Sequence, residues 1–76
     1  MKKNEYQEVI CAFAKNLKKN RLSKKISQEE LALLTGLDRT YISKIERQKA
    51  NPSLKTICLI AQELDISFLQ LFSKGE

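Results

Sequence analysis

The segment from residue 27 to residue 46 constrains the fold of this chain more than any other, because it carries the start and stop signals of two short helices. Ser27 can cap the first backbone N–H groups of a helix, and Glu30, three residues later, can complete a capping box. Gly36 follows where a residue in the left-handed conformation commonly ends a helix. Asp38 can then cap a second helix, so the segment predicts two helices joined by a tight turn.

The second helix of this unit is expected from Arg39 to Arg47, with Ile42 and Ile45 facing the protein interior. The residues that would face outwards are Arg39, Thr40, Ser43 and Lys44. Such polar side chains can form hydrogen bonds to base edges, and an arginine can donate twice to the O6 and N7 atoms of guanine. The alternative is that they are ordinary solvated side chains on a helix surface.

Hydrophobic periodicity predicts a long helix before this unit, from about Glu5 to Leu22. Its apolar face would comprise Tyr6, Val9, Ile10, Phe13, Ala14, Leu17 and Arg21. In the helix that Ser27 caps, the apolar stripe would comprise Leu31, Ala32 and Leu34. These two faces are expected to pack together in one core.

Two more helices are expected after a loop over residues 48–52. Ser53 can cap the first of them, and Asp65 stands where that helix would end. Its inward face would comprise Leu54, Ile57, Cys58, Ala61 and Leu64. Ser67 can cap a last short helix from Phe68 to Phe72. Residues 1–76 are therefore expected to form one all-α domain of five helices, with the helix-turn-helix unit at about residues 27–47.

The composition of the 76 residues narrows the classes of function. A net charge of +5 favours a polyanionic partner, although many small lysine-rich proteins are merely soluble. With no histidine, no glycine-rich phosphate loop and no paired carboxylates, the chain offers no catalytic constellation, so neither an enzyme activity nor a cofactor is expected.

The cysteines and the hydropathy of the chain bear on metal sites, disulfides and membrane insertion. Cys11 and Cys58 match neither a metal-ligand spacing nor a disulfide framework, so they are expected to be small buried side chains in a reducing cytoplasm, with no metal site. The start Met1-Lys2-Lys3 leads into polar residues, and no apolar run reaches about 18 residues. Neither a signal peptide nor a membrane span is therefore expected.

Several short motifs follow one another along the chain from Arg21 onwards. They are Arg21, SQEELA at residues 27–32, Gly36, YISKIE at residues 41–46, NPSL at residues 51–54, and IAQELDIS at the end of the fourth helix. Together they resemble the phage repressor and Cro type of helix-turn-helix domain, from about Phe13 to Phe72. The run DRTYISKIER followed by NPSL is most similar to the controller proteins of restriction–modification systems. The resemblance implies a lambda-repressor-like fold and a transcriptional regulator that binds double-stranded DNA.

The resemblance also implies roles for single residues. The helix from Arg39 would be the recognition helix in the major groove, with Arg39 as the main base contact and Thr40, Ser43 and Lys44 beside it. The residues expected to contact phosphates are Gln28, Tyr41, Arg47, Lys49, Asn51 and Ser53. For Tyr41 the alternative is packing against the preceding helix. Arg21 and Glu46 correspond to residues that form a buried ion pair in this family.

The C-terminal end predicts a homodimer. Apolar residues fill four positions within the last short helix, and Leu59 adds one on the outward side of the helix before it. The expected interface, within about residues 59–72, comprises Leu59, Phe68, Leu69 and Phe72. The alternative is that the long first helix folds over this patch and covers it. A two-fold dimer would bind a pseudo-palindromic operator.

Other functions remain open at this point. The same fold also serves other small phage-repressor-like regulators, and antitoxins or protein-interaction modules. RNA polymerase is a candidate partner through Glu29 and Glu30, although the two carboxylates are equally explained by the dipole at a helix N-terminus. Neither the operator sequence nor the choice between activation and repression follows from the sequence.

Overall fold

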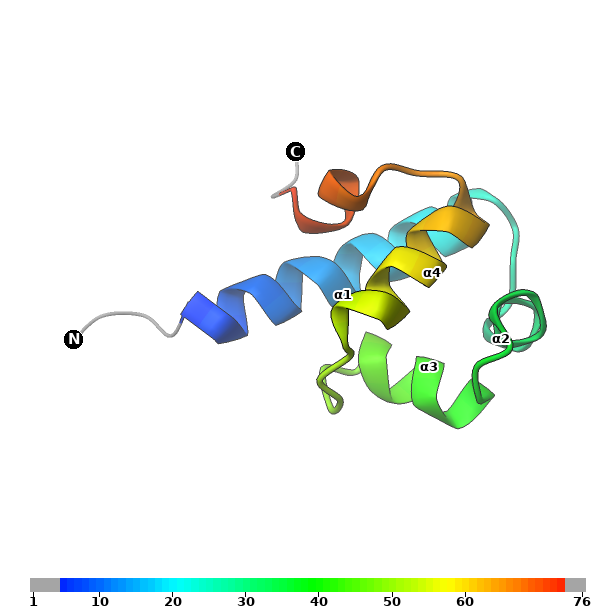
Figure 1. Cartoon of the computed structure of the whole chain (residues 1–76), viewed down its shortest axis with the longest axis horizontal. Helices are drawn as coiled ribbons and strands as arrows, with labels where there is room; N and C mark the ends of the chain where they lie inside the picture. Colours follow the sequence, from blue (N-terminus) through cyan, green and yellow to red (C-terminus); the bar gives the residue numbers. More distant parts are fainter. Residues whose placement is uncertain (1–4, 74–76) are drawn as a thin grey trace.

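The structure, a computed structural model, describes residues 5–73, which form four α-helices and one 3₁₀ helix (Figure 1). The elements are α1 (Glu5–Ser23), α2 (Gln28–Thr35), α3 (Arg39–Glu46), α4 (Leu54–Leu64) and η1 (Phe68–Phe72). The described range contains no strand, as the all-α prediction requires, and none of its helices is long and apolar enough to span a bilayer. The start of the chain, Met1-Lys2-Lys3, lies outside the described residues.

The helix starts follow the predicted caps with one exception. At α2 the Ser27 hydroxyl accepts from the Glu30 amide (3.0 Å) and the Glu30 carboxylate accepts from the Ser27 amide (2.8 Å). Ser53 caps α4, and Ser67 caps η1. The prediction for Asp38 is wrong in part, because it is the N-cap residue of α3 but its side chain makes no capping bond. Asp38 is exposed, so its carboxylate can stay solvated without a bond inside the protein.

Three helices end in Schellman motifs that place a non-glycine residue in the left-handed conformation. These residues are Lys25 (φ 59°), Gln48 (φ 62°) and Asp65 (φ 55°). After α3, the amide of Lys49 donates to the carbonyl of Lys44 (2.7 Å), and the amide of Gln48 donates to that of Ile45 (3.0 Å). The sequence predicted such an end only for Asp65. Gly36, with φ 75°, ends α2 as predicted.

The core draws fully buried side chains from all five elements. They are Phe13, Leu17, Leu31, Ile42, Ile45, Ile60, Leu64 and Leu71. The predicted inward faces are wrong at their margins. Tyr6 and Val9 are exposed because the first turns of α1 extend beyond the other helices (Figure 1), and Leu34 is exposed because α3 and α4 cover only one side of α2.

The inward face of α4 is rotated relative to the prediction. Ile60 is fully buried, whereas Leu54, in the first turn, is 70% exposed. Cys58 is exposed and Cys11 is half-buried, so the expectation that both cysteines are buried is wrong. Cys58 is exposed because α4 packs against α2 and η1 through a different stripe, Ile57, Ile60, Ala61 and Leu64. Cys11 lies on α1 and is not among the residues that this helix buries. Both cysteines are free thiols.

A buried ion pair connects α1 with α3. Arg21 Nε lies 2.7 Å from Glu46 Oε2, and Arg21 Nη2 donates to Glu46 Oε1 at 3.0 Å. The two side chains are 7% and 3% exposed. Arg21 Nη1 also donates to the carbonyl of Ile26 (2.8 Å), which fixes the link between α1 and α2. The guanidinium is therefore bonded on both of its outer edges, as a buried charge requires.

We predict that Arg21→Ala lowers the free energy of unfolding by about 3–5 kcal/mol, because it leaves the Glu46 carboxylate buried without its counter-ion. Urea unfolding followed by circular dichroism measures this. Arg47→Ala, which removes an exposed arginine, is the control and should change stability by less than about 0.5 kcal/mol. If the Arg21→Ala protein is as stable as the wild type but no longer binds the expected double-stranded DNA, then Arg21 contacts DNA and does not stabilise the fold.

Candidate nucleic-acid interface

The outer face of α3 is set by the two side chains that this helix buries. Ile42 and Ile45 are 0% and 1% exposed, so the opposite side of the helix faces solvent. The structure places the four predicted outward residues together on that side: Arg39, Thr40 and Lys44 are exposed, and Ser43 is half-buried. They form a polar, cationic surface on a helix of eight residues.

A further contact extends this surface towards the end of α3. Arg47 Nε donates to the Ser43 hydroxyl at 3.3 Å, one helical turn back along the chain. Arg47 was predicted to be a phosphate contact beyond the helix, yet its side chain lies against α3. The sequence contained a signal for this contact, the spacing of four residues, but did not show which rotamer Arg47 adopts.

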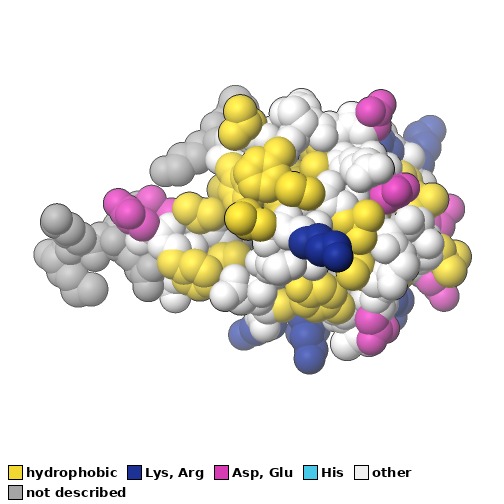
Figure 2. All heavy atoms as spheres, viewed as in Figure 1, with side chains coloured by type: hydrophobic (Ala, Val, Ile, Leu, Met, Phe, Trp, Pro, Cys, Tyr) yellow, Lys and Arg dark blue, Asp and Glu magenta, His cyan; other side chains and the backbone are white. Residues whose placement is uncertain are grey.

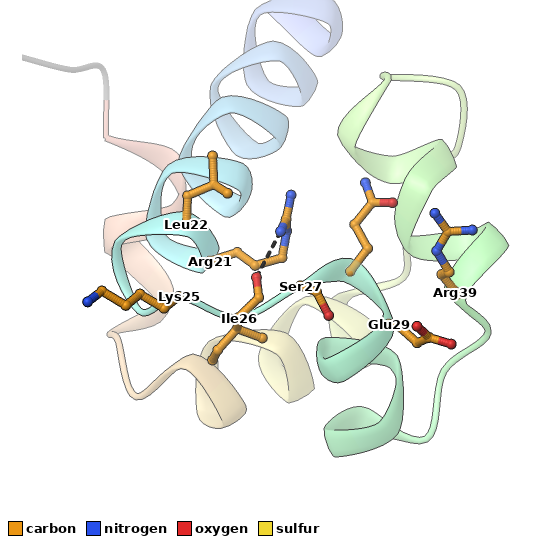
Figure 3. Close-up of a pocket in the computed structure, with 8 residues that line it drawn as sticks. Arg21, Leu22, Lys25, Ile26, Ser27, Glu29 and Arg39 are labelled. Carbon is orange, nitrogen blue, oxygen red and sulfur yellow. Dashed lines mark hydrogen bonds between the residues drawn. The ribbon is translucent and has the colours of Figure 1, made fainter.

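A shallow hollow of about 470 Å³ lies beside the start of α3 (Figure 3). It is lined by Arg21, Leu22, Lys25, Ile26, Ser27, Gln28, Glu29 and Arg39. In Figure 3 Arg39 projects on the same side as Glu29, while Lys25 points away. The hollow therefore adjoins the positive N-terminal end of α2 and the first turn of α3, where backbone N–H groups favour an anion.

Gln28 is already engaged inside the protein. Its side-chain Nε2 donates to Glu46 Oε1 at 3.1 Å, so Glu46 accepts from Gln28 as well as from Arg21. The primary amide keeps a second N–H for another acceptor. The sequence assigned Gln28 to a phosphate and missed this bond, because it joins residues eighteen positions apart.

The loop after α3 carries the remaining phosphate candidates. Lys49 and Asn51 are exposed, and the Schellman motif fixes the backbone of Lys49 directly after the helix. Ser53 uses its hydroxyl locally, accepting from the Thr56 amide (3.1 Å) and donating to the Thr56 hydroxyl (3.1 Å). Tyr41 is half-buried and packs against the hydrophobic core.

The residues of the expected dimer interface differ in exposure. Leu69 is 76% exposed, whereas Leu59, Phe68 and Phe72 are half-buried. Phe72 stacks on Phe13 of α1 with ring centroids 5.6 Å apart, so α1 covers part of the patch, as the alternative supposed. Figure 2 shows hydrophobic side chains gathered on the face where η1 lies. An exposed apolar surface remains around Leu69.

The structure shows two further features that the sequence did not predict. Asn16 of α1 donates to the carbonyls of Leu71 (3.0 Å) and Ser73 (2.7 Å), which ties η1 to α1. Leu33 is 80% exposed on α2. The signal for the bonds of Asn16 is a polar residue beside the apolar face of α1. The signal for the exposure of Leu33 is an apolar residue opposite the buried stripe of α2.

Comparison with known proteins identifies relatives of this chain. The model of a family described as helix-turn-helix matches residues 17–71. The control protein C.MunI of Mycoplasma sp is 45% identical over 70 residues, which cover 91% of this chain and 95% of that protein. The crystal structure of the restriction-modification controller protein C.AhdI from Aeromonas hydrophila matches with a TM-score of 0.80 at 43% identity, covering 83% of this chain and 96% of the other.

A third relative was solved with DNA. The restriction-modification controller protein C.Esp1396I, in the form of a tetramer in complex with its natural 35-base-pair operator, matches with a TM-score of 0.77 at 41% identity. The match covers 84% of this chain and 84% of that chain.

We predict that Gln28→Ala lowers the free energy of unfolding by about 1.5 kcal/mol, because it removes a hydrogen bond to a charged, buried acceptor. Thermal and urea unfolding measure the loss. Glu29→Ala, at the exposed neighbouring position in the same helical turn, is the matched control. Equal stabilities of the two variants would contradict a contribution of the Gln28–Glu46 bond.

Proposed function

This chain belongs to the helix-turn-helix family, and we propose that it is a transcriptional regulator that binds specific sites in double-stranded DNA as a homodimer. In this proposal α2 and α3 form the helix-turn-helix of a lambda-repressor-like domain, and α3 is the recognition helix. The observation that carries it is the polar outer face of α3, held against the rest of the protein by two buried isoleucines and the Glu46 carboxylate. The operator complex of C.Esp1396I supports the proposal through a similar fold.

The proposed base contacts lie on the outer face of α3. Arg39, in its first turn, is exposed and can donate two hydrogen bonds to a guanine. A positive charge at a helix N-terminus is slightly unfavourable against the helix dipole, which argues for a use outside the protein. Thr40, Ser43 and Lys44 would contact neighbouring bases or the adjacent phosphates.

The proposed phosphate contacts lie on both sides of this face. Gln28 would donate its second amide N–H at the start of α2, together with the backbone N–H groups there. Lys49 and Asn51 would contact the opposite strand from the loop after α3. Tyr41 and Ser53 are weaker candidates, since Tyr41 packs against the core and the Ser53 hydroxyl caps α4. These contacts would supply most of the affinity and its dependence on salt.

The proposed dimer places Leu59, Phe68, Leu69 and Phe72 at a two-fold interface. Its support is the exposed apolar surface around Leu69, in a domain with few buried residues of its own. A two-fold axis would hold two copies of α3 about 34 Å apart, which corresponds to half-sites about one helical turn apart. The operator would therefore be a pseudo-palindrome.

Within the family we propose that this chain is a restriction–modification controller that acts in the cytoplasm and has no enzyme activity. The similarity to C.MunI and C.AhdI over nearly their whole lengths supports this assignment. Contact with RNA polymerase through α2 has less support, because the Glu30 carboxylate bonds to the Ser27 amide within the capping box. A methyltransferase or endonuclease gene beside that of this protein would test the assignment.

We predict that Arg39→Ala weakens binding to the operator by about 1–3 kcal/mol and removes the preference at one base position, because a bidentate contact to guanine is lost. Electrophoretic mobility shifts with the operator and its single-base variants measure this. Lys49→Ala is the control and should weaken all sequences alike, with a smaller salt dependence. Equal weakening of specific and random DNA by Arg39→Ala would refute its role as a base contact.

We predict that Leu69→Glu raises the dimer dissociation constant by about 30-fold or more, because it buries a charge at the centre of an apolar contact. Sedimentation equilibrium over a range of concentrations measures this. Leu33→Glu, at a similarly exposed leucine on α2, is the matched control and should leave the dimer intact. A wild-type protein that is monomeric at micromolar concentration would contradict the dimer itself.

A further inference from the structure

A row of three residues runs along the outside of α3 and past its end. Arg39, Ser43 and Arg47 are spaced by four residues, so their side chains follow one line along the helix. Arg39 and Arg47 are exposed, and Ser43 is half-buried between them. Arg47 caps α3, and its side chain turns back along the helix to bond to Ser43.

The bond between Arg47 and Ser43 determines which N–H and O–H groups of these two residues can still bind an external acceptor. Arginine has five N–H groups, and only the one on Nε is used by the Ser43 hydroxyl oxygen. The groups on Nη1 and Nη2 are left for an external acceptor pair such as the O6 and N7 atoms of guanine. Because Ser43 accepts from Arg47, its own O–H is left to donate. The whole row therefore presents hydrogen-bond donors.

The direction of Arg47 argues against a phosphate contact. The bond to Ser43 holds the Arg47 side chain along the outer face of α3, which is the side that would meet the base edges in the proposed complex. The backbone after it turns away through the left-handed Gln48, and the exposed cation of Lys49 follows on that loop. Lys49 is therefore better placed than Arg47 to contact the sugar-phosphate backbone.

We propose that Arg47 is a second base-contacting arginine, which recognises a guanine, and that Ser43 is the residue that positions it. This inference rests on the proposed function and adds a specificity determinant to it. Residues 39 to 47 span about 12 Å at a rise of about 1.5 Å per residue. With about 3.4 Å between base pairs, each half-site should contain two guanines about three to four base pairs apart. The edge between them should offer an acceptor to Ser43.

The inference can be tested by selecting binding sites from a random duplex library with the full-length protein and its variants. The wild type should select both guanines in each half-site. Arg47→Ala should lose the preference at the guanine further from the one that depends on Arg39, with about 5- to 150-fold weaker binding to the wild-type site. Ser43→Ala should weaken the same preference partly, because Arg47 keeps its charge but loses its fixed direction.

The matched controls separate the possible results. Arg39→Ala should remove the preference for the other guanine, and Lys49→Ala should leave the preference for both guanines unchanged. If Arg47→Ala keeps every base preference and only weakens binding uniformly with a smaller salt slope, Arg47 contacts a phosphate and the inference is wrong, while the proposed function stands. If the wild type selects no sequence at all, the proposed function fails and this inference fails with it. Urea unfolding verifies that each variant is folded.

Discussion

The carboxylate of Glu46 is the group on which the arrangement of the first three helices depends. It belongs to α3, and it accepts hydrogen bonds from Arg21 of α1 and from Gln28 of α2. Arg21 adds a bond to the Ile26 carbonyl in the link between α1 and α2. Ionised groups this deeply buried are costly unless they are fully paired, and here each bond of the pair also joins two elements of the fold.

This network gives the outer face of α3 a fixed position. A helix of eight residues is too short to be stable alone, so its geometry must come from tertiary contacts. Ile42 and Ile45 hold its inner side in the core, and Glu46 holds its last turn. Arg39 and Arg47, which we propose to contact bases, are both exposed and take no part in this network. Recognition can therefore change at Arg39 or Arg47 without loss of the fold.

Features encoded by local side-chain chemistry could be predicted from the sequence. The capping box of Ser27 and the turn at Gly36 predicted where α2 begins and ends. The two isoleucines of α3 predicted which side of that helix faces outwards. The left-handed Lys25 and Gln48 could not be predicted, because neither residue type favours that conformation and the returning amide bonds impose it. The bond of Gln28 to α3 was also missed, since its sequence separation hides the contact until the helices are packed.

Hydroxyl-radical footprinting on the DNA upstream of the gene for this protein tests whether a two-fold dimer places two copies of α3 on specific DNA. If the proposed dimer binds this DNA, two half-sites related by a two-fold axis should be protected, with centres about 34 Å or one helical turn apart. The protection should disappear as the salt concentration rises, because phosphate contacts supply much of the affinity. A single protected patch would contradict the dimer of recognition helices. Protection that is no stronger than on random DNA, or that persists unchanged at high salt, would contradict sequence-specific DNA binding.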